Sequence, residues 1–154
     1  MTDPISLDFA VVTFEPIKEG WNEYSFSDHT IVKFRTIVTR IVKHKNTPIG
    51  QYDISFNNVN AVYSPPQNRG QPTNILQEEL EKTDKFEVQP ITSAEPWNEY
   101  RLIATDDVLK VKYVANAFYK IKDKFDQFGE PVYMVLGSPL ITPQLKTSKF
   151  KHTP

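Results

Sequence analysis

Hydrophobic and polar residues alternate along two long stretches of this chain, residues 30–45 and residues 107–122. Alternation with a period of two is typical of a β-strand with one buried face. Shorter apolar stretches at residues 6–14 and 85–92 predict one further strand each, and Gly-containing turns lead to strands that end at Pro65 and Pro143. The pattern therefore predicts an all-β, mainly antiparallel fold.

The tetrapeptide Trp-Asn-Glu-Tyr occurs twice, at residues 21–24 and 97–100. Its surroundings repeat in the same order: residues 31–35 align with 108–112, Lys43 with Lys120, residues 48–51 with 127–130, and residues 62–65 with 140–143. Agreement of order, spacing and chemistry favours an internal duplication over two unrelated β-meanders that share a start. The predicted repeat signature consists of Trp21, Tyr24, Trp97 and Tyr100.

The segment between the two halves has a different pattern. Residues 64–72 are a loop by composition, and residues 74–82 favour a short helix because Asn74 can cap it and Gln77 stands at the capping-box position. The predicted organisation is a first β repeat (1–65), a Pro-rich linker plus short helix (66–85), a second β repeat (86–143) and a basic C-terminal tail (144–154).

Each half is short for a fold without disulfides or metals. We therefore expect two small β-barrel or sandwich halves that pack together. One pseudo-symmetric unit and two abutting units both fit the pattern.

Strand alternation assigns the residues of the two long strands to faces. One face is apolar and predicts core, including Val32, Phe34, Val111 and Tyr113, with Arg40 as the exception. The opposite face reads basic, basic, apolar, polar, apolar, basic, basic in both copies, with Lys33, Arg35, Lys110 and Lys112 expected to be largely exposed. The candidate binding face is Lys33, Arg35, Ile37, Ile41, Lys43, Lys110, Lys112, Val114, Phe118 and Lys120.

This face has two interpretations. In the first, charged strand ends keep the protein soluble and discourage edge pairing, while the apolar middle packs against the other half or another subunit. In the second, the cations track phosphates and the floor stacks bases, as in small β-barrels that bind single-stranded nucleic acid. The first copy has no aromatic residue at Ile37 or Ile41, which favours the first interpretation.

The duplicated tryptophans also allow two roles. Trp21 and Trp97 can form a stacking platform for a ligand, or they can seal one end of each half while the adjacent Asn and Glu satisfy turn amides. Equivalent placement in both halves favours the structural role.

Composition narrows the function classes. The net charge of −1 argues against bulk attraction to nucleic acid, although basic strands and an acidic segment at residues 78–99 predict a polarised molecule. The absence of cysteine excludes thiol catalysis and thiolate metal sites. No secretory signal or long apolar stretch is evident, so we expect no membrane association and a cytoplasmic location.

Candidate chemistry is sparse. His29, His44 and His152 lack the close spacing of a metal site, and the chain has no phosphate-binding loop or nucleophile elbow. Carboxylates in the matching turns at Asp28 and at residues 106–107 offer one acid/base pair to an enzyme. We expect no catalytic residues, no metal and no cofactor.

The sequence thus predicts a non-catalytic binding or structural module whose duplicated β-scaffold binds a protein partner or a second copy of itself. The alternative is single-stranded nucleic-acid binding through the basic strand faces. A small hydrolase or sugar-processing enzyme that uses the duplicated turns ranks third.

Overall fold

The computed structural model describes residues 8–45, 51–73 and 82–145. These residues form antiparallel strands and one 3-10 turn, without an α-helix, which confirms the all-β prediction. The predicted helix falls on residues 74–82, of which 74–81 lie outside the described residues. The elements are β1 (Phe9–Val12), β2 (Phe14–Lys18), β3 (Asn22–Ser25), β4 (Ile31–His44), β5 (Tyr52–Tyr63), η1 (Pro66–Asn68), β6 (Lys85–Val88), β7 (Thr92–Ala94), β8 (Asn98–Leu102), β9 (Val108–Phe125) and β10 (Pro131–Gln144).

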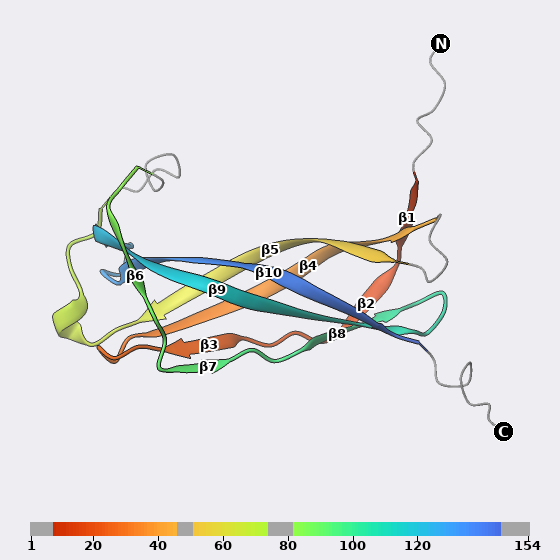
Figure 1. Ribbon diagram of the computed structural model, residues 1–154, viewed down its shortest axis with the longest axis horizontal. Helices are drawn as coiled ribbons and strands as arrows, with labels where there is room; N and C mark the ends of the chain where they lie inside the picture. The colour runs from red at the N-terminus through yellow and green to blue at the C-terminus, as the bar shows by residue number, and fades with distance from the viewer. Residues whose placement is uncertain (1–7, 46–50, 74–81, 146–154) are drawn as a thin grey trace, which may run out of the picture.

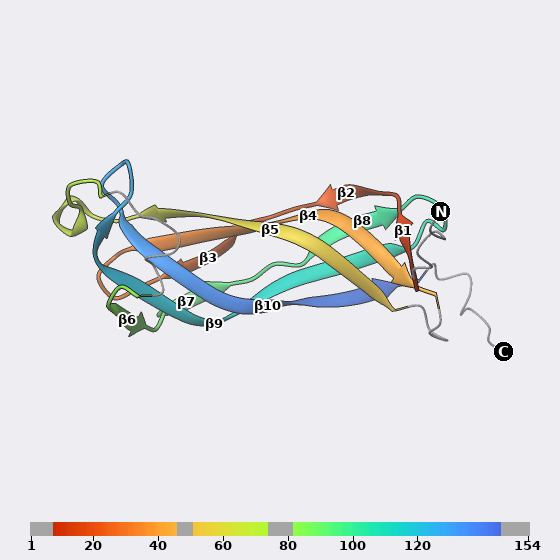
Figure 2. The same cartoon turned by 90° about the horizontal axis from the view of Figure 1, so that it is seen from above.

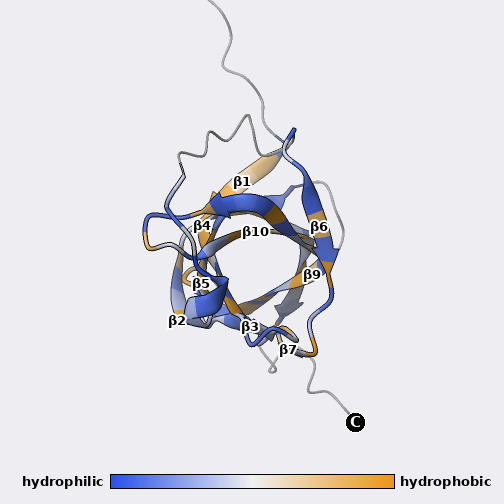
Figure 3. Cartoon of the chain, turned by 90° about the vertical axis from the view of Figure 1, so that its left-hand side faces the viewer, coloured by the Kyte–Doolittle hydropathy of each residue, from blue (hydrophilic) through white to orange (hydrophobic). Residues whose placement is uncertain are grey.

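The strands form two sheets that pack into one elongated body (Figures 1 and 2). In the first sheet β4 is central and pairs with β1, β3 and β5, while β3 also pairs with β7. In the second sheet β9 is central and pairs with β6, β8 and β10, while β8 also pairs with β2. Seen along the long axis, the strands of both sheets surround one interior (Figure 3).

The two halves of the chain exchange strands. The predicted single strands at residues 6–14 and 85–92 are each two short strands, and the chain passes from one sheet to the other between them. Strand β1 pairs with β4 of its own half, but β2 pairs with β8 of the other half. Likewise β6 pairs with β9, but β7 pairs with β3. Each sheet therefore contains one strand from the opposite half.

The core consists of two clusters, and each cluster draws on both halves. Tyr24, Phe26, Val32 and Phe34 pack with a group from the second half, namely Tyr113, Phe118 and Tyr133. Tyr100, Leu102, Leu109 and Val111 pack with Val38 and Ile41 from the first half. The predicted burial of Val32, Phe34, Val111 and Tyr113 is confirmed.

A β-bulge interrupts each long strand. Thr39 has no partner on β5, between Val38 and Arg40, and Asn116 has none on β10, between Ala115 and Ala117. Each bulged residue is the ninth residue of its strand. An extra residue reverses the alternation of side chains beyond it.

The reversal corrects the predicted faces. Ile41 is 0% exposed and Phe118 is 4% exposed, so both belong to the core instead of the outer face. Arg40, the exception on the predicted core face, is exposed for the same reason.

The register also corrects one part of the repeat alignment. Val32 aligns with Leu109 in the repeat. Val62 lies opposite Val32, but the residue opposite Leu109 is Pro143 instead of Leu140, with which Val62 is aligned. Residues 62–65 and 140–143 therefore do not occupy equivalent register positions. The fourth strands differ from the predicted alignment by three residues because the hairpins that lead to them differ in length.

Candidate binding surface

The repeated tyrosines form hydrogen bonds between the halves. Both tyrosines are fully buried. The Tyr24 hydroxyl donates to Glu95 Oε2 at 2.8 Å, and the Tyr100 hydroxyl donates to Glu19 Oε2 at 2.7 Å. Each glutamate stands two residues before its tryptophan, so the repeated unit is Glu-x-Trp-Asn-Glu-Tyr. The repeated glutamate is visible in the sequence when the repeat is extended two residues before the tryptophan.

The repeated asparagines complete this network. Asn22 Nδ2 donates to the backbone oxygen of Tyr113 at 2.9 Å, and Asn98 Nδ2 donates to that of Thr36 at 3.4 Å. The Gly20 N–H donates to Asn98 Oδ1 at 2.9 Å. Buried polar groups that are hydrogen-bonded in this way specify one arrangement of the surrounding strands. The Tyr and Asn residues of the repeat therefore have a structural role.

Burial and the glutamate hydrogen bonds hold the pKa of Tyr24 and of Tyr100 well above the usual value of 10. Burial, with a smaller contribution from Asp28, raises the pKa of Tyr133 to about 12. A raised folded-state pKa contributes stability that is complete below pH 10 and is lost as the pH rises toward the folded value.

Alkaline titration tests this network. The free energy of unfolding is expected to fall as the pH rises from 10 to 12, because unfolded tyrosines release protons that the folded protein retains. Urea unfolding at a series of pH values measures it. The Tyr24→Phe, Tyr100→Phe double variant removes two titrating groups and should show a shallower decline. An unchanged slope in that variant would contradict the assignment.

Cations on the outer faces lie against aromatic rings. The Arg35 guanidinium lies 5.7 Å from the Trp21 ring centroid, and the Lys112 ammonium lies 5.3 Å from that of Trp97. Arg35 Nη2 also lies 3.4 Å from Glu19 Oε1. Lys33, Arg35, Lys110 and Lys112 are half-buried, whereas strand alternation predicts that they are largely exposed.

The residues of the candidate binding face lie on two different sheets. Lys33, Arg35 and Ile37 lie on the outer face of the first sheet, whereas the outer face of the second sheet carries Lys110, Lys112 and Val114. Beyond the bulges, the Lys43 ammonium lies 5.9 Å from the ring centroid of Tyr52, Lys120 lines a cavity, and Ile41 and Phe118 are buried. The bulges thus divide the set among separate environments.

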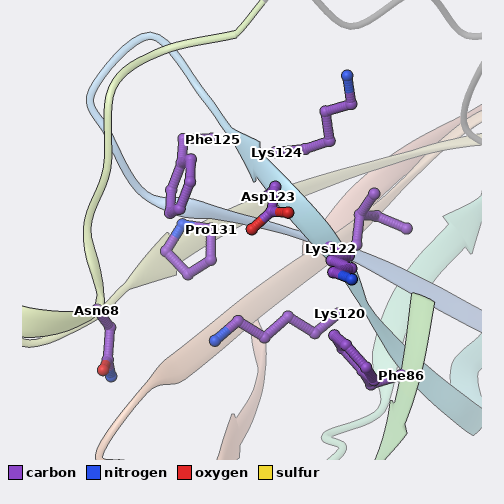
Figure 4. Close-up of a pocket in the computed structure, with 9 residues that line it drawn as sticks. Asn68, Phe86, Lys120, Lys122, Asp123, Lys124, Phe125 and Pro131 are labelled. Atoms are coloured by element: carbon purple, nitrogen blue, oxygen red, sulfur yellow. The ribbon is translucent and has the colours of Figure 1, made fainter. Parts of the chain in front are cut away.

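The cavity at Lys120 has a volume of about 280 Å³ (Figure 4). Phe86, Phe125 and Asn68 contribute to its walls. Lys120 extends toward Asn68, but Lys124 points away from the cavity. Lys120 and Lys124 therefore point in different directions, and Lys122 is the third lysine that lines the cavity.

Strand β5 presents a long edge. It pairs with β4 from Tyr52 to Tyr63, and no strand within the described parts of the chain pairs with its other side. The four consecutive residues 57–60 are all exposed, although β10 of the second sheet comes close to part of β5 without pairing with it. Asp53 is the one charged residue of β5, and the strand has no proline. Strand β10, which pairs with the central strand of the second sheet, contains Pro131, Pro139 and Pro143, and proline cannot donate a backbone hydrogen bond.

The register shows which backbone groups of β5 point outward. Directly opposite residues in an antiparallel pair either both bond to each other or both point away. In the β3–β4 hairpin, Phe26 N donates to Thr30 O at 2.9 Å, so these opposite residues form a hydrogen-bonded pair. Bonded and non-bonded pairs alternate along the ladder. Phe34, four residues after Thr30, therefore directs its backbone N–H and C=O toward β3. Asn60 lies opposite Phe34 on β5 and therefore directs its N–H and C=O away from β4.

A second cavity of about 280 Å³ is lined by the end of β5 and by the β9–β10 turn. These two segments lie at the same end of the molecule (Figure 1). Its walls come from residues 60–63 of β5 and from Asp126, Phe128 and Glu130. Phe128 is 75% exposed and Tyr63 is 56% exposed. We call this cavity the edge pocket. The candidate binding surface is therefore the outer edge of β5 together with the edge pocket.

The structure does not bring the proposed catalytic carboxylates together. The turn at Asp28 and the turn at residues 106–107 lie at opposite ends of the long axis (Figure 1). Asp28 Oδ1 accepts from Thr30 N at 3.1 Å, and Asp106 Oδ1 lies 3.1 Å from an Arg101 nitrogen. Within residues 8–45, 51–73 and 82–145, no group of three His, Asp or Glu side chains is placed to hold a metal ion.

None of the helices in the described residues has the length and apolar character needed to cross a membrane. Comparison of the chain with protein-family models, with curated proteins and with solved structures finds no match.

Proposed function

We propose that this chain is a non-catalytic binding module that accepts an extended segment of a partner protein on the outer edge of β5. The observation that carries the proposal is an edge twelve residues long with no proline and a single charge. Proteins usually protect such edges with proline, lysine or a bulge that turns the edge away, because unpaired backbone groups recruit other strands. Strand β5 lacks such protection, whereas β10 contains three prolines. An unprotected edge of this kind is typical of a surface that pairs with a strand of another molecule.

The partner class includes a second copy of the chain. Two β5 strands that pair antiparallel about a two-fold axis near Asn58 would place Asn57 opposite Val59 and Asp53 opposite Tyr63. No like charges meet in that arrangement. Self-association and pairing with a different protein thus use the same edge.

We also propose that the scaffold arose by internal duplication, with repeats at residues 1–65 and 86–143 joined by a linker at 66–85. Three features support this. The bulges occupy the same place in β4 and β9, the strand exchange is reciprocal, and the Tyr24–Glu95 and Tyr100–Glu19 hydrogen bonds correspond to each other. A duplicated scaffold explains why one edge can diverge for binding while its counterpart keeps prolines.

Nucleic-acid binding is the alternative. It is supported by the two cation–indole pairs at corresponding positions, Arg35 with Trp21 and Lys112 with Trp97. Against it, the pairs lie on different sheets, and each ring already has a cation against it. A salt-sensitive oligonucleotide complex that is lost in the Lys110→Glu, Lys112→Glu variant would favour this alternative over the edge.

The Asn60→Pro variant tests the edge. Proline removes an N–H that points away from β4, so the pairing with β4 and the fold should persist. A strand added at the outer edge would lose one backbone hydrogen bond and would clash with the pyrrolidine ring. We expect at least a tenfold loss, or about 1.4 kcal/mol, in affinity for peptides selected on the full chain from a phage-displayed random octapeptide library.

The Asn60→Ala variant is the matched control, because it removes the side chain and keeps the N–H. It should bind the peptides at least tenfold more tightly than Asn60→Pro does, and circular dichroism should show the same fold in both variants. Sedimentation equilibrium measures self-association in the same three proteins. Equal binding by Asn60→Pro and Asn60→Ala would contradict the proposal.

A further inference from the structure

We infer that the edge pocket receives one large apolar side chain of the segment that pairs with β5, next to a basic residue of that segment. The inference rests on the proposed function and adds the side-chain chemistry that the site selects. Backbone hydrogen bonds give strand addition its affinity, and side-chain pockets beside the edge give it specificity.

The position of the pocket follows from its wall. Four consecutive residues of β5, from Asn60 to Tyr63, line it. Consecutive residues point to opposite faces of a sheet. A cavity that touches all of them therefore lies beside the strand, at its edge, instead of over one face. A segment that pairs with the outward backbone groups of Asn60 must pass along this cavity.

The other wall is held in place by strong contacts. Glu130 Oε2 accepts from the backbone N–H and the hydroxyl of Ser64 at 2.8 and 2.7 Å, and Glu130 Oε1 lies 2.8 Å from Arg69 Nε. Gly70 N donates to Gly129 O at 3.0 Å, and Gly129 has a φ of +82°, which glycine adopts without strain. The turn is thus fixed to the chain just beyond β5, so the pocket exists before a partner arrives.

The chemistry of the lining defines the occupant. Phe128 and Tyr63 are exposed rings, which gain free energy when a large apolar side chain covers them. The lining itself contains no basic residue, although the Lys33 ammonium lies 5.7 Å from the ring centroid of Tyr63. Arg69 compensates Glu130, whereas the described residues provide no basic partner for Asp126, whose Oδ1 accepts only the N–H groups of Phe128 and Glu130. The charge left at the pocket favours a Lys or Arg beside the apolar side chain.

The Phe128→Ala variant tests the inference. The peptides selected on the full chain from the phage-displayed octapeptide library should share a Phe, Trp, Leu, Ile or Met with an adjacent Lys or Arg. When that apolar residue of the peptide is replaced by Ala, the affinity of the peptide for the unsubstituted protein should fall about tenfold. The same change in the peptide should reduce its affinity for the Phe128→Ala protein much less. Such coupling assigns the side chain to the pocket.

Phe86→Ala is the matched control, because Phe86 is also an exposed phenylalanine and lines the other cavity. It should bind all peptides as the unsubstituted protein does. If Phe128→Ala also binds them equally while Asn60→Pro does not, the pocket inference is wrong and the edge proposal stands. If Asn60→Pro retains binding, both are wrong.

Discussion

The Gly137→Ala variant is expected to lose at least about 3 kcal/mol of the free energy of unfolding. A Cβ at this position would collide with the backbone oxygen of Val114 and would lie 2.9 Å from the Cα of Ala115. Both are backbone atoms beside the Asn116 bulge, so no side-chain rotation relieves the overlap. The strands β9 and β10 would have to separate locally.

Urea unfolding measures the loss, and Gly20→Ala provides the control. A Cβ at Gly20 has Pro96 Cγ at 3.5 Å as its nearest neighbour, which is an ordinary van der Waals contact. The control should differ from the unsubstituted protein by less than about 1 kcal/mol. Equal stability of the two variants would mean that β9 and β10 are farther apart at the bulge than the structure places them.

The Phe118→Ala variant is expected to lose about 3–5 kcal/mol, the range for a buried phenylalanine. Phe118 is 4% exposed, and its ring centroid lies 4.6 Å from that of Tyr24 and 5.5 Å from that of Phe26. Truncation would leave a cavity where residues from the two halves meet. Denaturant unfolding followed by tyrosine fluorescence or circular dichroism measures the loss.

Val114→Ala is the comparison that makes this result informative. Unbroken alternation puts Val114 and Phe118 on one face, and the two truncations would then have similarly small effects. The bulge instead leaves Val114 half-buried on the outer face. Its truncation should cost less than about 1.5 kcal/mol. Equally small losses in both variants would restore the unbroken face and refute the bulge.

The strands themselves could be predicted from the sequence, because alternation and β-branched residues are local properties. Val32, Phe34, Val111 and Tyr113 were placed in the core on this basis, and they are buried there. The bulges could not be predicted in the same way. Thr39 is a common strand residue, and Asn116, although less common in strands, also fits an exposed strand position without a bulge. The extra residue can be recognised only when the partner strand fixes the register.

The candidate site could be predicted only in part, because its position depends on which strands pair. Strand alternation predicts the two basic outer faces, but it cannot predict that Ile41 and Phe118 leave these faces for the core, because that depends on the bulges. Which strand lies at an edge is also a property of the pairing. Once β5 is placed there, the lack of proline and the single charge at Asp53 become meaningful. Glu19 and Glu95 were within reach of a longer repeat comparison.

The exchange of strands has a consequence for how the chain folds as it is synthesised. Phe26 and Phe34 cannot complete their cluster until Phe118 and Tyr133 have left the ribosome. Strand β3 likewise waits for β7, and β2 waits for β8. Such long-range pairings slow folding because the loops that join them must close first. The nascent first half therefore emerges with an unfinished core, and this core is completed only after β9 and β10 have been made.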